Sequence, residues 1–257
     1  SYAEIINLEN PTFDKEIFTP KKKTIEKIIN DDVTLWYGVY ISNKKVGWYN
    51  GNFNKFNDDL YKIEEKLYLL MDMPGLEEGN KITTESEITS SMLFENTFPY
   101  RMVKYNEITT DNEGNEYSKK GFLKDGIFYL NIKNNNNKQE YKIKNLSQSL
   151  NDHLSLDAWA QESLRNKKDT IISKLFDFEE LSYVKYVFTI KDVIKTKVNG
   201  LDYTYYKVNL DQKNVRNGDK QLNIEYLIDL KGKYLNFNMF EIFEFRSENE
   251  DEAKNLD

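Results

Sequence analysis

Hydrophobic and polar residues alternate with a period of two along much of the chain, which predicts β-strands. The clearest stretch runs from Trp36 to Phe53. Tyr37, Val39 and Ile41 share one strand face, while Trp36, Gly38 and Tyr40 share the other. The polar segment Ser42-Asn43-Lys44-Lys45 predicts a turn, after which Val46 and Trp48 resume the alternation. This stretch is therefore predicted to be an opening β-hairpin with aromatic residues on both faces.

Strand-like segments follow one another through the rest of the chain. Leu60 to Met71 fits a strand or a helix, of which we favour the strand, and Met73-Pro74-Gly75 predicts a turn. Asn199-Gly200 between two alternating runs is the strongest short-range signal for a hairpin. The other predicted strands are Ile82–Phe94, Tyr100–Thr110, Glu116–Leu123, Gly126–Ile132, Gln139–Leu146, Thr170–Phe176, Tyr186–Val198, Leu201–Leu210, Gln221–Asp229 and Tyr234–Phe245.

Two segments carry helical spacing instead. Thr24 to Ile29 predicts a short helix, and Ser155 is a candidate N-cap for a second helix whose apolar stripe is Leu156, Trp159, Ala160 and Leu164, ended by Lys167-Lys168-Asp169. Residues 1–32 are predicted to be a tether packed on the sheet, 33–246 a single β-rich domain, and 247–257 an acidic tail that is helical or loose.

Both faces of several strands carry large apolar residues, so one helix cannot cover them all. We therefore predict a mainly β protein: a strongly curved antiparallel sheet, curled into a half-open barrel, with one packed helix and a short N-terminal helix.

Composition narrows the possible partners. A formal charge of −7 over 257 residues argues against nucleic acid and anionic membrane surfaces, and the basic run Lys21-Lys22-Lys23 is too short to change this. No segment of about 18 consecutive apolar residues predicts a membrane span. The absence of cysteine removes thiol nucleophiles, cysteine-ligated zinc and disulfides. The chain begins at Ser1 without an initiator Met, so we expect that a signal segment has been removed upstream.

Candidate chemical sites all have plainer explanations. His153, the single histidine, follows Asp152, but no nucleophile is placed near it by sequence, so it is predicted to be a helix-entry residue. Asp111 to Glu116 has oxygen ligands at alternating positions without the EF-hand spacing, and is predicted to be a solvated hairpin turn. The carboxylate pairs are predicted to lie on solvated faces: Asp58-Asp59, Glu64-Glu65, Glu77-Glu78 and Glu179-Glu180. No cofactor, metal or catalytic residue is predicted.

Several short motifs, spread over residues 33–255, resemble the β-rich domain that precedes the catalytic domain in bacterial transglutaminase-like proteins. They are Trp36-x-Gly38-Val39-Tyr40, Lys45-Val46-Gly47-Trp48, Phe176-Asp177, Asn199-Gly200-Leu201 and Ser247 to Ala253. The resemblance implies an exported protein, periplasmic or otherwise associated with a bacterial envelope, whose fold is similar to the half-open barrels of lipoprotein carriers. Because the chain has no Cys, no catalytic residue is carried over.

The aromatic strands supply the best functional candidate. Tyr and Trp side chains on the curved sheet predict a cleft for an apolar or amphipathic ligand or a partner's segment, and our candidate binding residues are Trp36, Tyr40, Trp48, Tyr203 and Tyr205. Core packing is the alternative use of these aromatics. The predicted function is a non-enzymatic binding or accessory module. A carboxylate-based hydrolase and a structural spacer remain the alternatives: a buried carboxylate pair beside the cleft would favour the first, and the absence of a cleft the second.

Overall fold

A computed structural model describes residues 3–31, 33–74, 81–162, 169–215, 218, 220–229, 232–239 and 241–256. Its strands form one sheet in the order β1-β9-β8-β7-β6-β5-β4-β3-β2-β15-β14-β13-β12-β11-β10. The strands are β1 (Glu4–Asn7), β2 (Val33–Ile41), β3 (Lys44–Lys55), β4 (Leu60–Pro74), β5 (Lys81–Glu95), β6 (Met102–Asp111), β7 (Glu116–Lys124), β8 (Ile127–Asn134), β9 (Asn137–Lys144), β10 (Thr170–Asp177), β11 (Ser182–Val198), β12 (Leu201–Asn214), β13 (Lys220–Asp229), β14 (Tyr234–Met239) and β15 (Phe243–Ser247).

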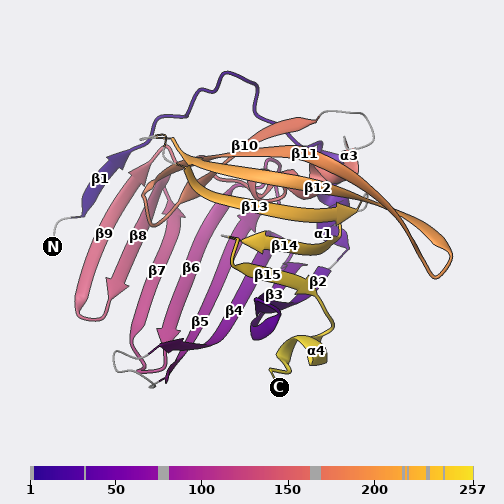
Figure 1. The fold of residues 1–257 in the computed structure, drawn as a ribbon. Coiled ribbons are helices and arrows are strands. Elements are labelled where there is room, and N and C mark those ends of the chain that lie inside the picture. Colours follow the sequence, from indigo (N-terminus) through magenta and orange to yellow (C-terminus); the bar gives the residue numbers. More distant parts are fainter. Residues whose placement is uncertain are drawn as a thin grey trace.

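The sheet curls strongly, so that β10–β15 pass in front of the wall formed by β4–β9 (Figure 1). Every neighbouring pair is antiparallel except β1 and β9. The strands β1 and β10 end the sheet without pairing to each other, so the barrel is half open. The predicted fold class, a mainly β protein with a strongly curved antiparallel sheet, is confirmed.

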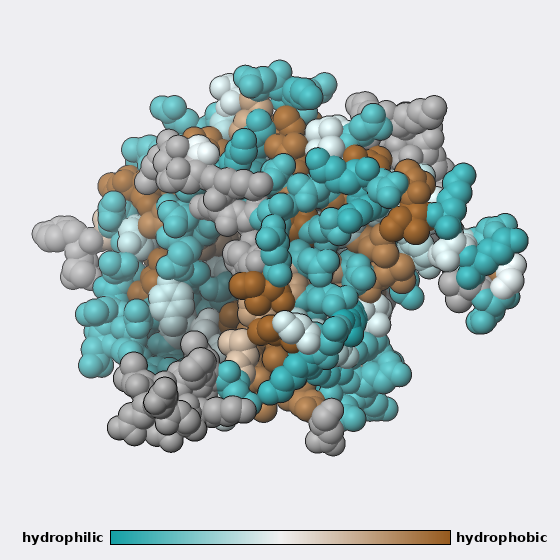
Figure 2. Space-filling model, in the orientation of Figure 1, coloured by the Kyte–Doolittle hydropathy of each residue, from teal (hydrophilic) through white to brown (hydrophobic). Residues whose placement is uncertain are grey.

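Apolar side chains fill the concave side in three clusters. One joins β4–β9 to the β10–β11 turn around Phe94 and Phe128, the second lies under β10–β13 around Trp159, and the third lies between β2, β3 and β15 around Tyr37. On the surface, hydrophilic residues cover most of the face seen in Figure 2, and hydrophobic residues gather between them in patches. Alternation along the strands therefore separates a filled inner face from a mixed outer face.

Four short helices complete the part of the fold that the structure describes. Helix α1 (Lys22–Asn30) buries Ile25, Ile28 and Ile29, as the predicted helix over Thr24–Ile29 requires. Helices α2 (Leu150–His153) and α3 (Ser155–Glu162) join β9 to β10, and α4 (Glu250–Lys254) lies against β2 and β3. No helix of the described residues has the length and apolar character needed to cross a membrane.

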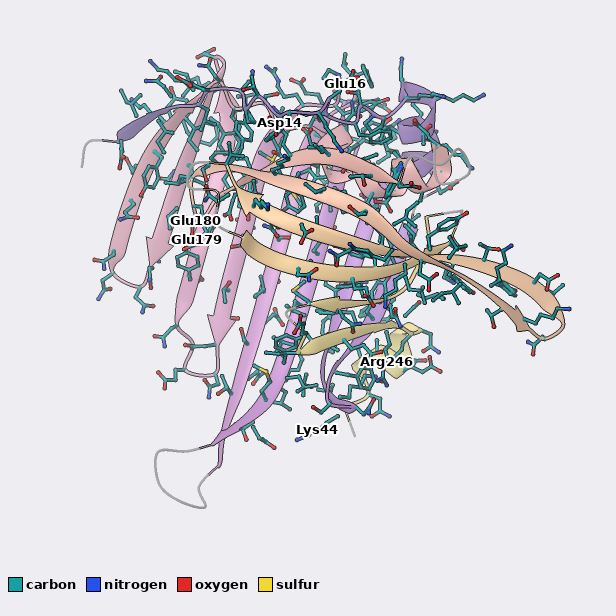
Figure 3. The ribbon with its side chains drawn as sticks, turned by 45° about the horizontal axis from the view of Figure 1, so that its top comes forward. Asp14, Glu16, Lys44, Glu179, Glu180 and Arg246 are labelled. Atoms are coloured by element: carbon teal, nitrogen blue, oxygen red, sulfur yellow. The ribbon has the colours of Figure 1, made fainter. Side chains whose placement is uncertain are left out.

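The N-terminal segment bridges the two ends of the sheet. The backbone N–H of Leu8 donates to Lys144 on β9, and that of Phe18 donates to Ile172 on β10, at 3.2 and 2.8 Å. Figure 3 shows Asp14 and Glu16 on this crossing. The segment that we predicted to be a tether thus supplies hydrogen-bond partners to both halves of the sheet, which partly offsets their unpaired edges.

The predicted hairpins form with the expected turns. Asn199 and Gly200 have φ angles of 51° and 79°, and Ser42 and Asn43 have 48° and 66°, as two-residue hairpin turns require. The strand favoured for Leu60 to Met71 is confirmed by β4, although it continues through Pro74. The predicted turn at Met73-Pro74-Gly75 therefore begins too early, and Gly75 lies outside the described residues.

Three predictions of local structure were wrong. The predicted strand Tyr234–Phe245 is two strands, because Ile242 N–H bonds to Met239 O in a turn. Ser155 is the first residue of α3 rather than an N-cap; the chain turns helical earlier, where the Asp152 carboxylate accepts from the backbone N–H and hydroxyl of Ser149. The remainder of that predicted helix, Leu164 to Lys168, lies outside the described residues.

The third correction concerns the opening hairpin. The register shifts between Val39 and Tyr40, so β3 contains a bulge at Val46. Val46 is buried with Tyr37, Val39 and Phe245, although simple alternation had placed it on the face of Trp48. One extra residue in a strand moves the following side chains to the opposite face, and a period-two pattern alone does not reveal it.

Candidate functional site

A row of polar side chains crosses the inner face of four neighbouring strands. In the register of the sheet, Glu65 on β4 stands opposite Ser90 on β5, Ser90 opposite Glu107 on β6, and Glu107 opposite Lys119 on β7. Adjacent strands are about 4.8 Å apart, so each side chain of this row can contact the next. We call these four residues the inner polar ladder.

Hydrogen bonds link the ladder to tyrosines. The Tyr49 hydroxyl donates to Glu65 at 2.7 Å, and the Ser90 hydroxyl donates to the other oxygen of Glu65 at 3.2 Å. The Tyr105 hydroxyl donates to Glu107 at 2.7 Å. Each carboxylate thus accepts from at least one neutral hydroxyl of this chain, which orients it.

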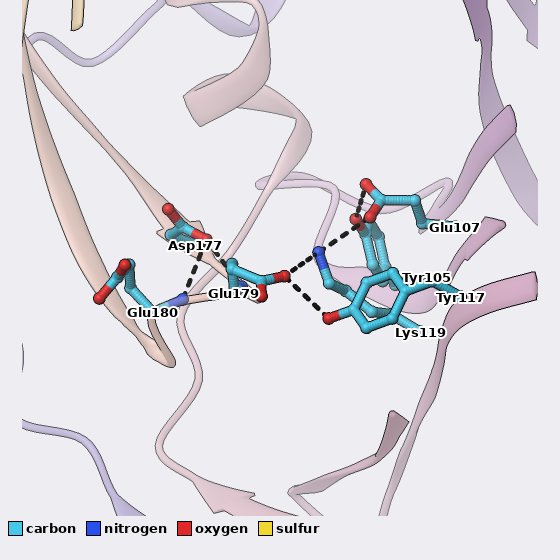
Figure 4. A network of polar contacts seen from close by, with 7 residues as sticks. All are labelled: Tyr105, Glu107, Tyr117, Lys119, Asp177, Glu179 and Glu180. Carbon is cyan, nitrogen blue, oxygen red and sulfur yellow. Dashed lines mark hydrogen bonds and ion pairs between the residues drawn. The ribbon is translucent and has the colours of Figure 1, made fainter. Parts of the chain in front are cut away.

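Lys119 connects the ladder to the opposite side of the barrel. Its ammonium lies 2.8 Å from a Glu107 oxygen and 2.8 Å from a Glu179 oxygen, and Glu179 belongs to the β10–β11 turn (Figure 4). The Tyr117 hydroxyl also donates to Glu179, at 2.8 Å. The Asp177 carboxylate shapes the turn by accepting from the backbone N–H groups of Glu179 and Glu180. Lys119 therefore holds together two parts of the sheet that are far apart in sequence.

The surroundings set the charge of these groups. Burial lowers the pKa of Lys119, but its hydrogen bonds to Glu107 and Glu179 outweigh burial and leave the pKa raised. For Glu179, burial is likewise outweighed by the bonds from Lys119 and Tyr117, and the pKa is lowered. Burial, together with the bond to Glu179, raises the pKa of Tyr117 to about 12. At neutral pH the site therefore contains ionised Lys119 and Glu179 beside neutral tyrosines that donate hydrogen bonds.

The ladder faces a cavity of about 220 Å³ between the two walls, which we call the inner cavity. Its lining joins the four ladder residues to Met92, Tyr105, His153, Leu175, Phe176, Asp177, Phe178 and Tyr186. One wall is thus polar and carries more carboxylates than ammonium groups, while the opposite side is largely apolar. Such a surface suits a molecule with a polar end and an apolar end.

His153 lies at the edge of this cavity in a structural position. Its Nε2 is 2.8 Å from the Gln148 side-chain nitrogen, and its ring packs edge-on against Phe94 at 5.4 Å between centroids. Burial lowers its pKa to about 4, so the ring is neutral at physiological pH. His153 is the last residue of α2 and stands two residues before α3, so it does lie at the entry to the helix predicted from Ser155. No group of three or more acidic, His or Cys side chains within the described ranges is arranged to hold a metal ion.

The aromatic residues that we predicted to bind a ligand lie elsewhere, in two groups. Trp36 and Trp48 pack on the outer face with 5.6 Å between ring centroids, and Lys254 of α4 lies 4.8 Å from the Trp36 ring. Tyr40, also on this face, donates to Glu248. Tyr203 and Tyr205 stack on each other at 6.1 Å in the β11–β12 hairpin that projects from the barrel (Figure 1). The structure does not bring the two groups together, and their binding role stays a prediction.

Sequence reasoning missed the ladder. Glu64-Glu65 and Glu179-Glu180 were assigned to solvated faces. This is wrong for Glu65, which bonds inside the barrel, whereas Glu179 is 61% exposed as predicted, although it also pairs with Lys119. Asp58 and Lys55 form a solvated pair as expected, and Glu77-Glu78 lies outside the described residues. A signal was present: Glu65 lies between Ile63 and Leu67 at the inward positions of its strand, where a charged residue breaks the apolar pattern.

Comparison with known proteins supports the fold. No protein-family profile matches the chain, and no curated protein matches it in sequence. Among solved structures, the chain is similar to the crystal structure of a β-barrel-like protein of the domain of unknown function DUF1849 from Brucella abortus. The TM-score is 0.56 at 13% sequence identity, over 84% of this chain and 94% of that one. The match shows a shared β-barrel-like fold, and the resemblance to transglutaminase-associated domains stays a prediction.

Proposed function

We propose that the protein is a non-enzymatic binding module whose inner cavity holds a small amphipathic ligand or the apolar side chain of a partner segment. The observation that carries this proposal is the inner polar ladder, a registered row of polar side chains that faces a cavity whose other lining residues are mostly apolar or aromatic, apart from His153 and Asp177. Burying charged groups is costly, and a barrel that only needed a core would be filled by apolar residues.

Cavity size limits the ligand. Sites for drug-sized molecules usually measure about 300 to 1,000 Å³, so the 220 Å³ cavity suits a head group with a short chain rather than a long acyl chain. Burying about 150 Å² of apolar surface contributes roughly 4 kcal/mol before association costs, about what a millimolar dissociation constant requires, so tighter binding needs polar contacts with the ladder in addition.

The hydrolase alternative has less support. Glycoside hydrolysis needs two carboxyl groups that flank the bond to be broken. Ser90 stands between Glu65 and Glu107 in the ladder, and each carboxylate is already engaged, by Tyr49 and Ser90 or by Tyr105 and Lys119. Location in a bacterial envelope is also proposed, on the sequence resemblance alone; recovery of the protein exclusively in the cytosolic fraction of its host would contradict it.

Binding can be followed by the fluorescence of Trp159, which is buried in the cluster that Tyr186 packs against. The double variant Trp36→Phe, Trp48→Phe leaves Trp159 as the single tryptophan. The probes are an apolar environment-sensitive dye, octylamine and octanoate. We expect at least one of them to bind and to change the Trp159 emission.

Ser90→Leu fills the cavity and should weaken binding at least about tenfold, an effect of about 1.4 kcal/mol. Ser91→Leu, on the same strand but the opposite face, is the matched control and should bind normally. Ser90→Ala keeps the space and checks that a loss is due to blocking. The proposal fails if the folded protein binds none of the probes, or if Ser91→Leu weakens binding as much as Ser90→Leu does.

A further inference from the structure

A second and larger hollow, of about 620 Å³, lies where β12–β15 meet the β2–β3 turn. Asn209, Glu225, Asn238 and Glu244 stand opposite one another on these four neighbouring strands and line it. They alternate along their strands with residues of the apolar core, such as Leu210, Ile224 and Phe245, so they point outward. We call this hollow the outer amide groove. Its volume is in the usual range for ligand sites.

Three carboxylates line the outer amide groove; Glu225 and Glu244 are paired within the chain, and Glu241 is exposed to solvent. Lys207 lies 3.0 Å from the Glu225 carboxylate, and Arg246 lies 2.6 Å from the Glu244 carboxylate. Arg246 also donates to the Asn43 side chain at 2.7 Å, and Figure 3 shows Arg246 and Lys44 at the same end of the barrel. An anionic ligand would meet the carboxylates of the lining, and a cationic one would find Glu225 and Glu244 already paired, so the groove favours a neutral ligand.

The amide side chains define what such a ligand must offer. Each Asn side chain carries both a donor and an acceptor, which matches groups that also donate and accept, such as hydroxyls. The side-chain oxygen of Asn223, which lines the groove, is enclosed and has no hydrogen-bond partner. A ligand donor would reach this oxygen once the Asn223 side chain turned toward the groove, and because an unpaired buried acceptor is unfavourable, that turn would break no hydrogen bond of the oxygen.

Apolar residues complete one end of the groove. Ile41, Ile242 and Phe243 contribute to its lining, and Ile242 is 57% exposed. Figure 2 shows hydrophobic residues gathered over the turn that joins β14 and β15, bordered by hydrophilic ones. A pyranose ring presents hydroxyls at its rim and C–H groups on its faces, so it could contact both kinds of surface together.

We propose that the outer amide groove binds a neutral saccharide chain. An extended peptide is the less suitable occupant, because β12, β13, β14 and β15 are each paired on both sides and offer no free edge along the groove. Recognition must therefore come from side chains that stand on the sheet face. The four opposed residues extend over three strand spacings, about 14 Å, which gives room for a short oligosaccharide.

The test uses maltohexaose, cellohexaose and chitohexaose, titrated into the full chain by calorimetry and by amide chemical-shift mapping. We expect at least one of them to bind and to shift resonances of β12–β15. Asn238→Ala should weaken that binding about tenfold or more. Asn106→Ala, on the outer face of β6, is the matched control and should leave it unchanged.

Asn223→Leu separates recognition from folding. It removes the unpartnered acceptor, so the melting temperature should stay level or rise while saccharide affinity falls. The proposal is overturned if the folded protein binds none of the three saccharides at millimolar concentration, if shifts map away from β12–β15, or if Asn106→Ala weakens binding as Asn238→Ala does. Binding of an extended polar peptide in the groove in place of every saccharide also overturns it. Ser90→Leu, which blocks the inner cavity, should not alter saccharide binding, so the two proposals can fail separately.

Discussion

Replacing Lys119 by Met tests whether the inner polar ladder depends on its single ammonium group. The Lys119 side chain is 8% exposed, and its partners Glu107 and Glu179 are 22% and 61% exposed. Met keeps most of the volume and removes the charge. Glu107 would then remain partly buried with the Tyr105 hydroxyl as a donor but without a counter-charge, which is unfavourable in a site of low polarity.

The geometry sets the size of the effect. Two unit charges 2.8 Å apart interact by about 6 kcal/mol at an effective dielectric constant of about 20, before the cost of removing them from water. Removing one partner of a buried pair typically costs about 3 to 5 kcal/mol, while an exposed pair such as that with Glu179 contributes about 0 to 1. Because Glu107 is partly exposed, we expect Lys119→Met to lower the free energy of unfolding by about 3 kcal/mol.

Urea unfolding at pH 7 of four proteins gives the coupling energy directly: the wild type, Lys119→Met, Glu107→Gln and the double variant. Since Glu107→Gln removes the carboxylate that Lys119→Met leaves unpaired, the double variant should be about 2 kcal/mol more stable than the sum of the single effects predicts. Strictly additive effects, or a loss below about 1 kcal/mol for Lys119→Met, would refute the role given to this ion pair.

Three further predictions concern groups outside the ladder. Burial raises the pKa of Asp157 to about 7, so the stabilisation that goes with its protonated form is lost as pH rises through 7. We therefore expect Asp157→Asn to raise the free energy of unfolding by about 1 to 3 kcal/mol at pH 8.5 and by almost nothing at pH 4, as measured by urea unfolding. Burial lowers the pKa of His153 to about 4, so the free energy of unfolding should fall as pH drops from about 6.5 to 4. His153→Gln should remove that part of the pH dependence, and a variant whose stability varies with pH as the wild type's does would contradict this prediction. A Cβ on Gly47 would lie 2.0 Å from the Tyr68 carbonyl oxygen, so Gly47→Ala should cost several kcal/mol in thermal denaturation, whereas Gly114→Ala, at a φ of 77° in open space, should cost about 1.

The fold could be predicted from the sequence to the extent that it depends on local signals. Alternation and turn residues suffice for the hairpins at Ser42-Asn43 and Asn199-Gly200, because φ angles above zero favour Asn and Gly. They do not suffice where pairing decides the outcome. The bulge at Val46 and the division of Tyr234–Phe245 into two strands depend on which strand lies alongside, and the chain pairs β15 with β2 across more than 190 residues of sequence.

The candidate site could not be predicted from the sequence either, because it too depends on which strands pair with each other. The four ladder residues come from four strands, and only the register places them in one row. Aromatic content drew attention to Trp36 and Trp48, which the structure places on the outer face beside α4. Tyr186, which is not among our five candidate binding residues, does line the inner cavity. The aromatic content of the strands therefore indicates large side chains on both faces of the sheet. It does not indicate which of the two faces encloses a cavity.

The sequence does contain charged residues at strand positions where the alternating pattern predicts apolar ones, and these residues lie around the inner cavity. Glu65 lies between apolar inward residues on β4, and Lys119 is 7% exposed although lysine is rarely buried. Apolar residues of similar volume in place of a buried ion pair are often as stable or more stable, so stability alone gives no reason to keep these charges. Sequences usually depart from the pattern of their fold at functional or strained positions. None of Glu65, Ser90, Glu107 and Lys119 has a φ angle above zero, so left-handed backbone strain does not explain the charged row, and the binding role that we propose for the inner cavity would explain it.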